Sequence, residues 1–264
     1  MKLGLMSLVF VLFSNVLAAD LSWPQLSTAQ QSWIGERIYQ NETGGKREHL
    51  TFWSAAEEFP SFGIGHFIWI PAGVNVPFEP TFESMVKFVS QTHPAPKWVL
   101  QPHAPWKSKT AFDLAKSSTD MKELRDWLAD TKPQQADFII QRFQQRIHHL
   151  SSQTLAEQPG LVHKLNRLMQ TPQGLFALID YVNFKGIGDN PLERYQGQGW
   201  GLVQVLQAMP HDLTQQASDK QVLELFVEAA IRTLQRRVEL APTARNETRW
   251  MAGWKIRVQG YLKD

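Results

Sequence analysis

The chain has 264 residues, of which 43% are hydrophobic, and its formal net charge is only +2. This length and composition predict one large domain with its own core, and so modest a charge argues against a nucleic-acid-binding protein. The absence of cysteine excludes disulfide bonds, a thiol nucleophile and a cysteine-ligated metal.

The first residues have the features of a secretory signal peptide. Lys2 precedes an almost wholly apolar run from Leu3 to Phe13, and residues 16–18, Val-Leu-Ala, match a small-residue cleavage site. We expect residues 1–18 to be removed and the mature chain to be periplasmic or secreted. The apolar run is too short to span a membrane comfortably, so we expect no stable membrane insertion after cleavage. A buried first helix or a retained anchor is the alternative.

The first helix of the mature chain is predicted at residues 29–42, "AQQSWIGERIYQNE", after a serine or threonine cap. Ile34, Ile38 and Glu42 lie four residues apart and therefore share one face of this helix. Thr43-Gly44-Gly45 then ends the helix, because glycine readily adopts the left-handed conformation that follows helix C-termini. This places Glu42 at the end of an apolar helix face.

A small β element is predicted next. Short β segments between Phe59 and Ile70 flank a Gly-Ile-Gly turn that ends in His66. Residues 71–109 are rich in proline and aromatic residues, which predicts loop with one short helix at about 82–89.

The rest of the chain predicts helices. The helix at 172–184 is apolar on nearly every side, which is typical of a helix buried in the middle of a domain. Serine or threonine caps precede two of these helices, at Ser118 or Thr119 and at Thr171. The predicted helices cover residues 118–130, 133–150, 172–184, 200–209, 220–238 and 247–262. The fold class expected is α+β, mainly helical, with a small β-hairpin or sheet after the first helix of the mature chain.

Glu42 is the first candidate for acid–base chemistry. The carbonyl dipoles at a helix end disfavour a negative charge, and apolar neighbours disfavour it further, so both effects predict a raised pKa for this carboxyl. A carboxylic acid that stays protonated near neutral pH can donate its proton to a leaving oxygen. The alternative is a surface glutamate at a frayed helix end.

Glu57, Glu58 and Ser61 could complete such a site. A second carboxylate that stays ionised can support an oxocarbenium ion or activate water. Adjacent residues on a strand face opposite ways, so only one of the two glutamates should reach a cleft. Ser61 follows within a turn, and its hydroxyl could position a water molecule.

Glu42 and the stretch Ser61-Phe62-Gly63-Ile64-Gly65-His66 resemble the phage-type lysozymes of glycoside hydrolase family 24 and the wider lysozyme-like superfamily. In that family the first helix ends at a catalytic glutamate, and a β-hairpin then carries a second acid, a Thr or Ser and a Gly-Ile-Gly-His turn. Two later stretches match in the same order. "LIDYVNFKGIGDN" resembles the central buried helix of the family, and "APTARNETRWMAGWKIR" resembles its closing segment. The resemblance covers about residues 27–70 and 172–260.

The resemblance implies a lysozyme-like glycoside hydrolase that cleaves peptidoglycan, or a related β-1,4-linked amino-sugar polymer, without a cofactor. Glu42 would be the general acid, and Ser61 would hold the water. The family's aspartate lies about six residues before the hydroxyl, where this chain has Ala55. Glu57, ahead of Glu58, is therefore the candidate second carboxylate.

The end of the central helix offers candidates for substrate binding. Tyr181 and Asn183, with Gln198 in the following loop, could bind an N-acetyl group or a sugar hydroxyl; alternatively, Tyr181 packs in the core and Asn183 caps the helix. Asp180 lies inside so apolar a helix that we expect a buried partner, such as a C-terminal arginine. We expect His66 to be structural and to pair with a carboxylate or a carbonyl. The other histidines are scattered, which predicts no metal site.

We therefore expect a signal peptide at 1–18 and a single lysozyme-like domain at 19–264, with a proline- and aromatic-rich insertion at about 71–135. The missing aspartate motivates a second hypothesis. On the same scaffold, the protein could bind cell-wall glycan without cutting it, or inhibit another hydrolase.

Overall fold

The computed structural model describes residues 21–76, 78–150, 158–211, 213 and 216–263. Over these residues the fold is α+β and mainly helical, as the sequence predicted. The predicted signal peptide and its cleavage site lie outside the described residues. Within the described ranges, no helix is long and apolar enough to cross a membrane.

The α-helices are α1 (Thr28–Thr43), α2 (Phe82–Val89), α3 (Lys109–Ala115), α4 (Thr119–Asp130), α5 (Lys132–Leu150), α6 (Pro159–Met169), α7 (Pro172–Lys185), α8 (Leu202–Ala208), α9 (Asp219–Leu240) and α10 (Thr248–Gln259). The strands are β1 (Thr51–Phe52), β2 (Ser61–Phe62), β3 (Phe67–Ile68), β4 (Arg194–Tyr195) and β5 (Gln198–Gly199).

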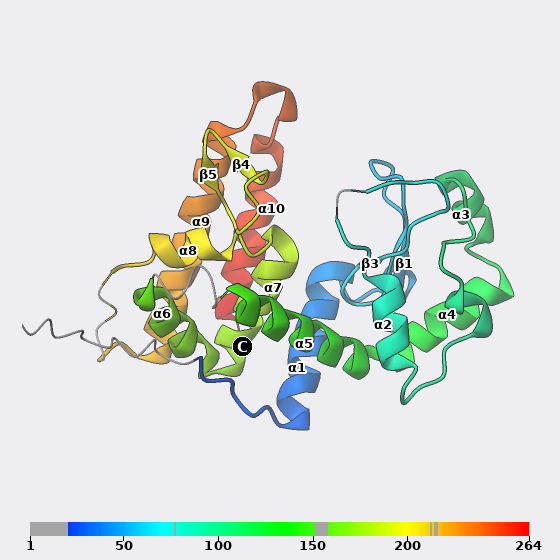
Figure 1. Cartoon of the computed structure of the whole chain (residues 1–264), viewed down its shortest axis with the longest axis horizontal. Coiled ribbons are helices and arrows are strands. Elements are labelled where there is room, and N and C mark those ends of the chain that lie inside the picture. Colours follow the sequence, from blue (N-terminus) through cyan, green and yellow to red (C-terminus); the bar gives the residue numbers. More distant parts are fainter. Residues whose placement is uncertain (1–20, 77, 151–157, 212, 214–215, 264) are drawn as a thin grey trace, which may run out of the picture.

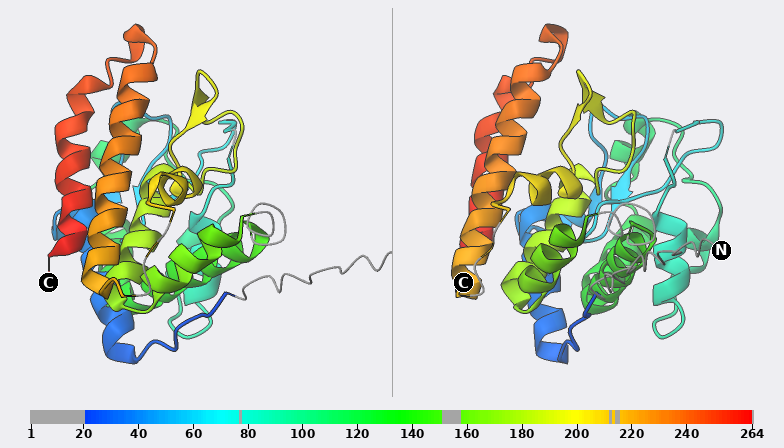
Figure 2. Two further views of the ribbon diagram at one scale, coloured as in Figure 1. Left: turned by 90° about the vertical axis from the view of Figure 1, so that its left-hand side faces the viewer. Right: turned by 60° about the vertical axis from the view of Figure 1, so that its left-hand side comes forward.

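These elements form two lobes that are joined by α1 and α5 (Figure 1). The first three strands, α2, α3 and α4 make up the sheet lobe, and α6 to α10 with β4 and β5 make up the helical lobe. Figure 2 shows α9 and α10 side by side along the helical lobe. One cluster of buried hydrophobic residues extends through both lobes.

Both ends of α1 follow from local sequence. The Ser27 hydroxyl accepts a hydrogen bond from the backbone N–H of Gln30 and so caps the start, while Gly44 has a φ of 64° and ends the helix. Ile34 and Ile38 are buried where α1 packs against α5 and α7. Glu42 continues their face by one turn and is thereby carried to the junction of the two lobes.

The sheet after α1 is antiparallel, in the order β1-β2-β3. Thr51, Phe62 and Phe67 are paired across the strands, and all three are buried on its inner face. Because successive residues of a strand face opposite ways, Ser61 and its partner Ile68 lie on the outer face.

The region at 71–135 packs onto this sheet and completes the core of the sheet lobe. The rings of Phe82, Trp106 and Phe112 pack around Phe62, with centroid distances of 4.9 to 6.2 Å. Large aromatic side chains packed in this way bury much apolar surface. The aromatic residues of this region therefore stabilise the sheet lobe.

The Gly-Ile-Gly-His turn is attached to α5 by Gln135. This side chain is fully buried; its Oε1 accepts from the backbone N–H of Ile64 (3.0 Å) and its Nε2 donates to the carbonyl of Leu128 (2.6 Å). Gly63 has a φ of 70°, and a Cβ there would lie 2.2 Å from Gln135 Oε1. The turn therefore needs glycine at this position for both its backbone conformation and its space.

Gly63→Ala is expected to lower the free energy of unfolding by about 2–4 kcal/mol, through backbone strain and displacement of the buried amide. Gly73→Ala is the matched control, because Gly73 has a φ of 87° and no atom near the position of a Cβ. Gly73→Ala introduces backbone strain alone and should lower the free energy of unfolding by about 1 kcal/mol. Urea unfolding of both variants measures the difference, and equal losses would contradict the role of Gln135.

Candidate active site

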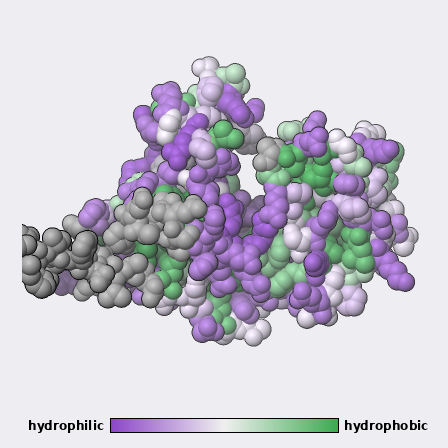
Figure 3. All heavy atoms as spheres, in the orientation of Figure 1, coloured by the Kyte–Doolittle hydropathy of each residue, from purple (hydrophilic) through white to green (hydrophobic). Residues whose placement is uncertain are grey.

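A cleft of about 630 Å³ lies between the two lobes, and Glu42 is among the residues that line it. Figure 3 shows the hollow from outside, with mostly hydrophilic residues along its floor. The charged residues that line it are Glu42, Glu79, Arg142, Arg146, Asp189, Glu193 and Arg257. A cleft of this size with so polar a lining suits a hydrophilic ligand better than an apolar one.

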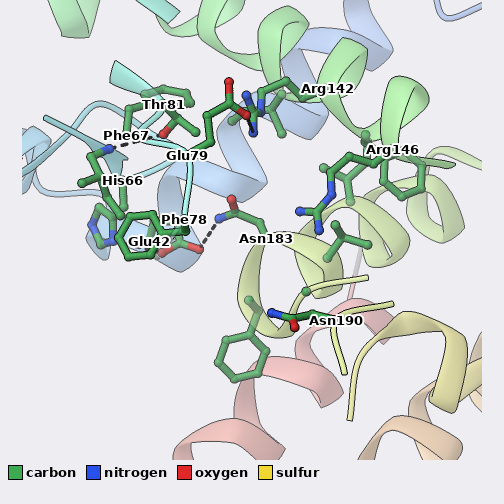
Figure 4. A pocket seen from close by; sticks show the side chains of 18 of the residues that line it. Glu42, His66, Phe67, Phe78, Glu79, Thr81, Arg142, Arg146, Asn183 and Asn190 are labelled. Carbon is green, nitrogen blue, oxygen red and sulfur yellow. Dashed lines mark hydrogen bonds and ion pairs between the residues drawn. The ribbon is translucent and has the colours of Figure 1, made fainter. Parts of the chain in front are cut away.

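Three side chains bind Glu42 inside this cleft, and Figure 4 labels two of them, His66 and Asn183. Its Oε1 accepts hydrogen bonds from Arg257 Nη2 and from Asn183 Nδ2, the latter at 3.1 Å, and its Oε2 lies 3.2 Å from His66 Nδ1. The Glu42 side chain is only 10% exposed. The structure thus brings together Glu42 from the end of α1, His66 from the turn after β2 and Asn183 from the end of α7.

Arg257 is shared between Glu42 and a second carboxylate, Asp180. Its Nε and Nη2 donate to the two oxygens of Asp180 at 2.9 and 2.8 Å, and the Tyr261 hydroxyl donates to the same carboxylate at 2.6 Å. The expectation that Asp180 pairs with a C-terminal arginine is confirmed. Burial lowers the pKa of Arg257, but Asp180 and Glu42 outweigh burial and raise it above its ordinary value. The guanidinium is therefore a permanent cation next to Glu42.

His66 reaches Glu42 from a strained backbone position. Its φ of 48° lies in the left-handed region, which a residue other than glycine seldom adopts. The imidazole stacks on Phe52, with 6.2 Å between ring centroids and 16° between planes. The expectation that His66 pairs with a carboxylate is confirmed, and strain of this kind is found mainly at functional sites.

The predicted rise in the pKa of Glu42 is wrong for this arrangement. Burial does raise the pKa, but the hydrogen bond from His66 and the positive charge of Arg257 outweigh burial and lower the pKa to about 2. The helix end and the apolar face are evident in the sequence, whereas these two partners come together only in the folded chain. At neutral pH, Glu42 is therefore ionised as the structure holds it.

This lowered pKa predicts an acid-dependent loss of stability. A fall in the pKa from an ordinary 4.5 to about 2 means that ionised Glu42 contributes about 3 kcal/mol to the free energy of unfolding. This contribution is present above the pKa of an unfolded glutamate and is lost as the pH falls towards 2. Between pH 6 and pH 2, the wild type should lose about 2–3 kcal/mol more than Glu42→Gln, which has no carboxyl to protonate. Urea unfolding across this range measures the difference, and parallel curves would contradict the assignment.

The structure does not bring the other hairpin candidates into the cleft. Glu57 and Glu58 are exposed in the loop between β1 and β2, and neither lines the cleft. Ser61 lies on the outer face of the sheet beside Ile68, which does line the cleft, but Ser61 itself does not. Nearness in sequence to the Gly-Ile-Gly-His turn therefore does not bring these residues to the lining of the cleft.

Two of the three predicted substrate-binding residues also lie elsewhere. Tyr181 is fully buried and its hydroxyl donates to the carbonyl of Trp200 at 2.9 Å, so it packs in the core, as the alternative had it, and does not line the cleft. Gln198 accepts a hydrogen bond from Arg236 Nε (3.1 Å) in a separate hollow of about 440 Å³. Asn183 alone lines the cleft, and there it donates to Glu42.

Several residues that line the cleft escaped the sequence reasoning. Phe78, Glu79 and Thr81 come from the segment after β3, which was expected only as loop. Arg142 and Arg146 come from α5, where their spacing of four residues places both on one helix face. That spacing is a signal in the sequence, but only the packing of α5 shows that the face borders the cleft.

The arrangement combines a buried carboxylate with amide, hydroxyl and aromatic groups along an open cleft. Such groups can transfer a proton and bind a polar ligand. Among the described residues, no group of three or more His, Asp or Glu side chains could hold a metal ion. Comparisons with protein-family models, curated proteins and solved structures found no match.

Proposed function

We propose that this chain is a lysozyme-like glycoside hydrolase that cleaves peptidoglycan or a related β-1,4-linked amino-sugar polymer. The observation that carries the proposal is the Glu42 carboxylate, buried at the end of α1 in an open cleft and bound by Asn183, His66 and Arg257. The resemblance of the hairpin turn to that of phage-type lysozymes supports the same assignment.

The proposed reaction begins with a glycan lying along the cleft between the lobes. The Asn183 and Asn190 amides face the cleft and can bind N-acetyl groups or sugar hydroxyls. Glu42 then gives its proton to the glycosidic oxygen as the bond breaks. No cofactor is required for this chemistry.

Glu42 must gain a proton before it can act as an acid. With a pKa of about 2, protonation at pH 7 costs about 7 kcal/mol. Excluding water alone would not reduce this cost, because it strengthens the effects of His66 and Arg257 as well as that of burial. In the proposed mechanism a glycan in the cleft displaces His66 from Oε2, which removes an interaction that lowers the pKa of Glu42. Arg257 is not left unpaired when Glu42 becomes neutral, since both of its hydrogen bonds to Asp180 remain. The proposed acid is therefore charged at rest and protonated with substrate in place.

The proposed substrate lies outside the cytoplasm, where the predicted signal peptide would deliver the mature chain. Peptidoglycan or a related glycan is thus the expected partner in the periplasm or outside the cell. Neither a membrane nor a nucleic acid is part of the proposed reaction.

The experiment is incubation of the mature chain with purified sacculi. A hydrolase should release soluble muropeptides that carry new reducing ends, and these ends should increase with time. Glu58→Gln is a suitable control, because Glu58 is exposed outside the cleft and its variant should release muropeptides at the wild-type rate. A wild type that releases none from intact or de-O-acetylated sacculi would overturn the proposal.

The second candidate is a non-catalytic protein that binds cell-wall glycan or inhibits another hydrolase. The observation that favours it is that no carboxylate of the hairpin lines the cleft, since Ala55 replaces the family's aspartate and Glu57 lies outside. Such a protein would sediment with sacculi without releasing muropeptides.

A further inference from the structure

The cleft lacks a second carboxylate from the hairpin, and the neighbouring segment after β3 provides an acid and a hydroxyl instead. We propose that Glu79 is the second catalytic carboxylate and that Thr81 holds the attacking water, in the roles first expected for Glu57 and Ser61. This inference rests on the proposed hydrolase function.

Glu79 and Thr81 both line the cleft that contains Glu42. The Glu79 side chain is 75% exposed and therefore open to water, and its Oε2 lies 3.8 Å from Arg142 Nη2. Figure 4 shows Glu79 extending towards Arg142 from the same segment as Phe78. A carboxylate that accepts a proton from water needs this access to solvent.

Thr81 is attached to the edge of the sheet. Its hydroxyl oxygen accepts a hydrogen bond from the backbone N–H of Ile68 at 3.3 Å. Since the oxygen is used as an acceptor, its own hydrogen can be donated to a water in the cleft. This bond also fixes the segment that carries Glu79 beside β3, so the acid and the hydroxyl are presented together.

Two other carboxylates line the cleft, Asp189 and Glu193, but neither has a hydroxyl-bearing residue of the cleft lining close to it in the chain, as Glu79 has Thr81. Among the described residues that line the cleft, Thr81 is the only serine, threonine or tyrosine. Asp189 and Glu193 both follow α7, whereas Glu79 comes from the sheet lobe. A sugar bound between the lobes would have Glu79 on the sheet-lobe side.

Phe78 gives a further reason to choose Glu79. Its ring is 43% exposed and lines the same cleft as Glu42. The ring also packs edge-on against Phe59 at 5.7 Å, which supports it from behind. An exposed aromatic ring can stack on the apolar face of a sugar. A sugar stacked there would lie in the cleft that Glu42 lines, with Glu79 one residue along the chain from the ring.

In the proposed step, water attacks the anomeric carbon while Glu79 accepts a proton and Glu42 donates one. The water oxygen forms a bond to the anomeric carbon, and the water gives one proton to the Glu79 carboxylate. The bond between that carbon and the glycosidic oxygen breaks, and the leaving oxygen takes the proton of Glu42. Because water rather than Glu79 attacks the carbon, the configuration at that carbon is inverted.

The test is the rate of sacculus digestion by Glu79→Ala with and without sodium azide. We expect Glu79→Ala to be at least about 100-fold slower than the wild type, as loss of a general base predicts. Azide needs no base and fits the space left by the side chain, so it should restore part of the rate and yield a glycosyl azide. Glu57→Ala, the matched control, should stay within about twofold of the wild type.

Thr81 is tested by Thr81→Val, which removes the hydroxyl and keeps the shape. Thr81→Val should reduce the rate of sacculus digestion by roughly tenfold, because one hydrogen bond to the attacking water is lost. Thr81→Ser, which keeps the hydroxyl, should digest sacculi at nearly the wild-type rate. Thermal melting followed by circular dichroism tests whether the Glu79 and Thr81 variants are folded. We expect Glu79→Ala to be folded, because the Glu79 side chain is 75% exposed.

The outcomes separate this inference from the proposed function. An active wild type with Glu79→Ala within twofold of it, or with a loss that azide does not restore, would overturn the inference alone. An azide-restored loss in Asp189→Ala or Glu193→Ala instead would also overturn it. A wild type that releases no muropeptides would overturn the proposed function and this inference with it.

Discussion

Arg257→Met is expected to lower the free energy of unfolding by about 3–5 kcal/mol. Arg257 binds both Glu42 and Asp180, and the Asp180 side chain is fully buried. Removing the cation leaves two carboxylates close together without their partner, and the loss of one member of a buried ion pair typically costs this much. Urea unfolding at pH 7 measures the change.

Arg249→Met is the control for that measurement, because Arg249 is exposed on the same helix, α10. A surface substitution of this kind should change stability by less than about 0.5 kcal/mol. If Arg257→Met lowered the free energy of unfolding no more than the control does, the ion pairs of Arg257 would contribute nothing to stability, and the ionised state assigned to Glu42 would be wrong.

Glu42→Gln is expected to slow muropeptide release from sacculi by about 1,000-fold, because loss of a general acid typically costs between about 100- and 10,000-fold. Glutamine keeps the size of the side chain and can still bind Asn183, so the variant should sediment with sacculi as the wild type does. Quantifying the released reducing ends and the sedimented protein in one experiment separates cleavage from binding.

Glu36→Gln is the matched control for the loss of cleavage. Glu36 lies on the same helix, pairs with Lys132 at 3.1 Å and is 49% exposed outside the cleft. Its variant should cleave at the wild-type rate. Equal activity of Glu42→Gln and Glu36→Gln would remove Glu42 from the mechanism.

The helices could be predicted well because their signals are local. Ser118 and Thr171 accept hydrogen bonds from backbone N–H groups at the starts of α4 and α7, in the positions that the sequence indicated. Strand β1 could not be predicted in the same way, because Thr51 and Phe52 become a strand only through pairing with β2. The short helix α3 could not be predicted either. It lies in the region at 71–135, whose structure depends on packing against the sheet.

The candidate site could be predicted in part. Glu42 and His66 are close in sequence, and the resemblance to phage-type lysozymes already connected them. Arg257 is far from both along the chain, so only the folded structure shows that it binds Glu42 and reverses the expected change in pKa. Glu57 was chosen for its spacing from Ser61, whereas the folded chain brings Glu79 to the cleft through the attachment of Thr81 to β3.

Proton donation by Glu42 is tested most directly by changing the leaving group. The measurement is kcat/KM of the wild type and of Glu42→Gln on one amino-sugar oligosaccharide, ending either in a sugar or in a dinitrophenyl group, which leaves without a proton. The account predicts a loss of about 1,000-fold for the sugar leaving group and less than about tenfold for dinitrophenyl. Equal losses on both substrates would contradict it.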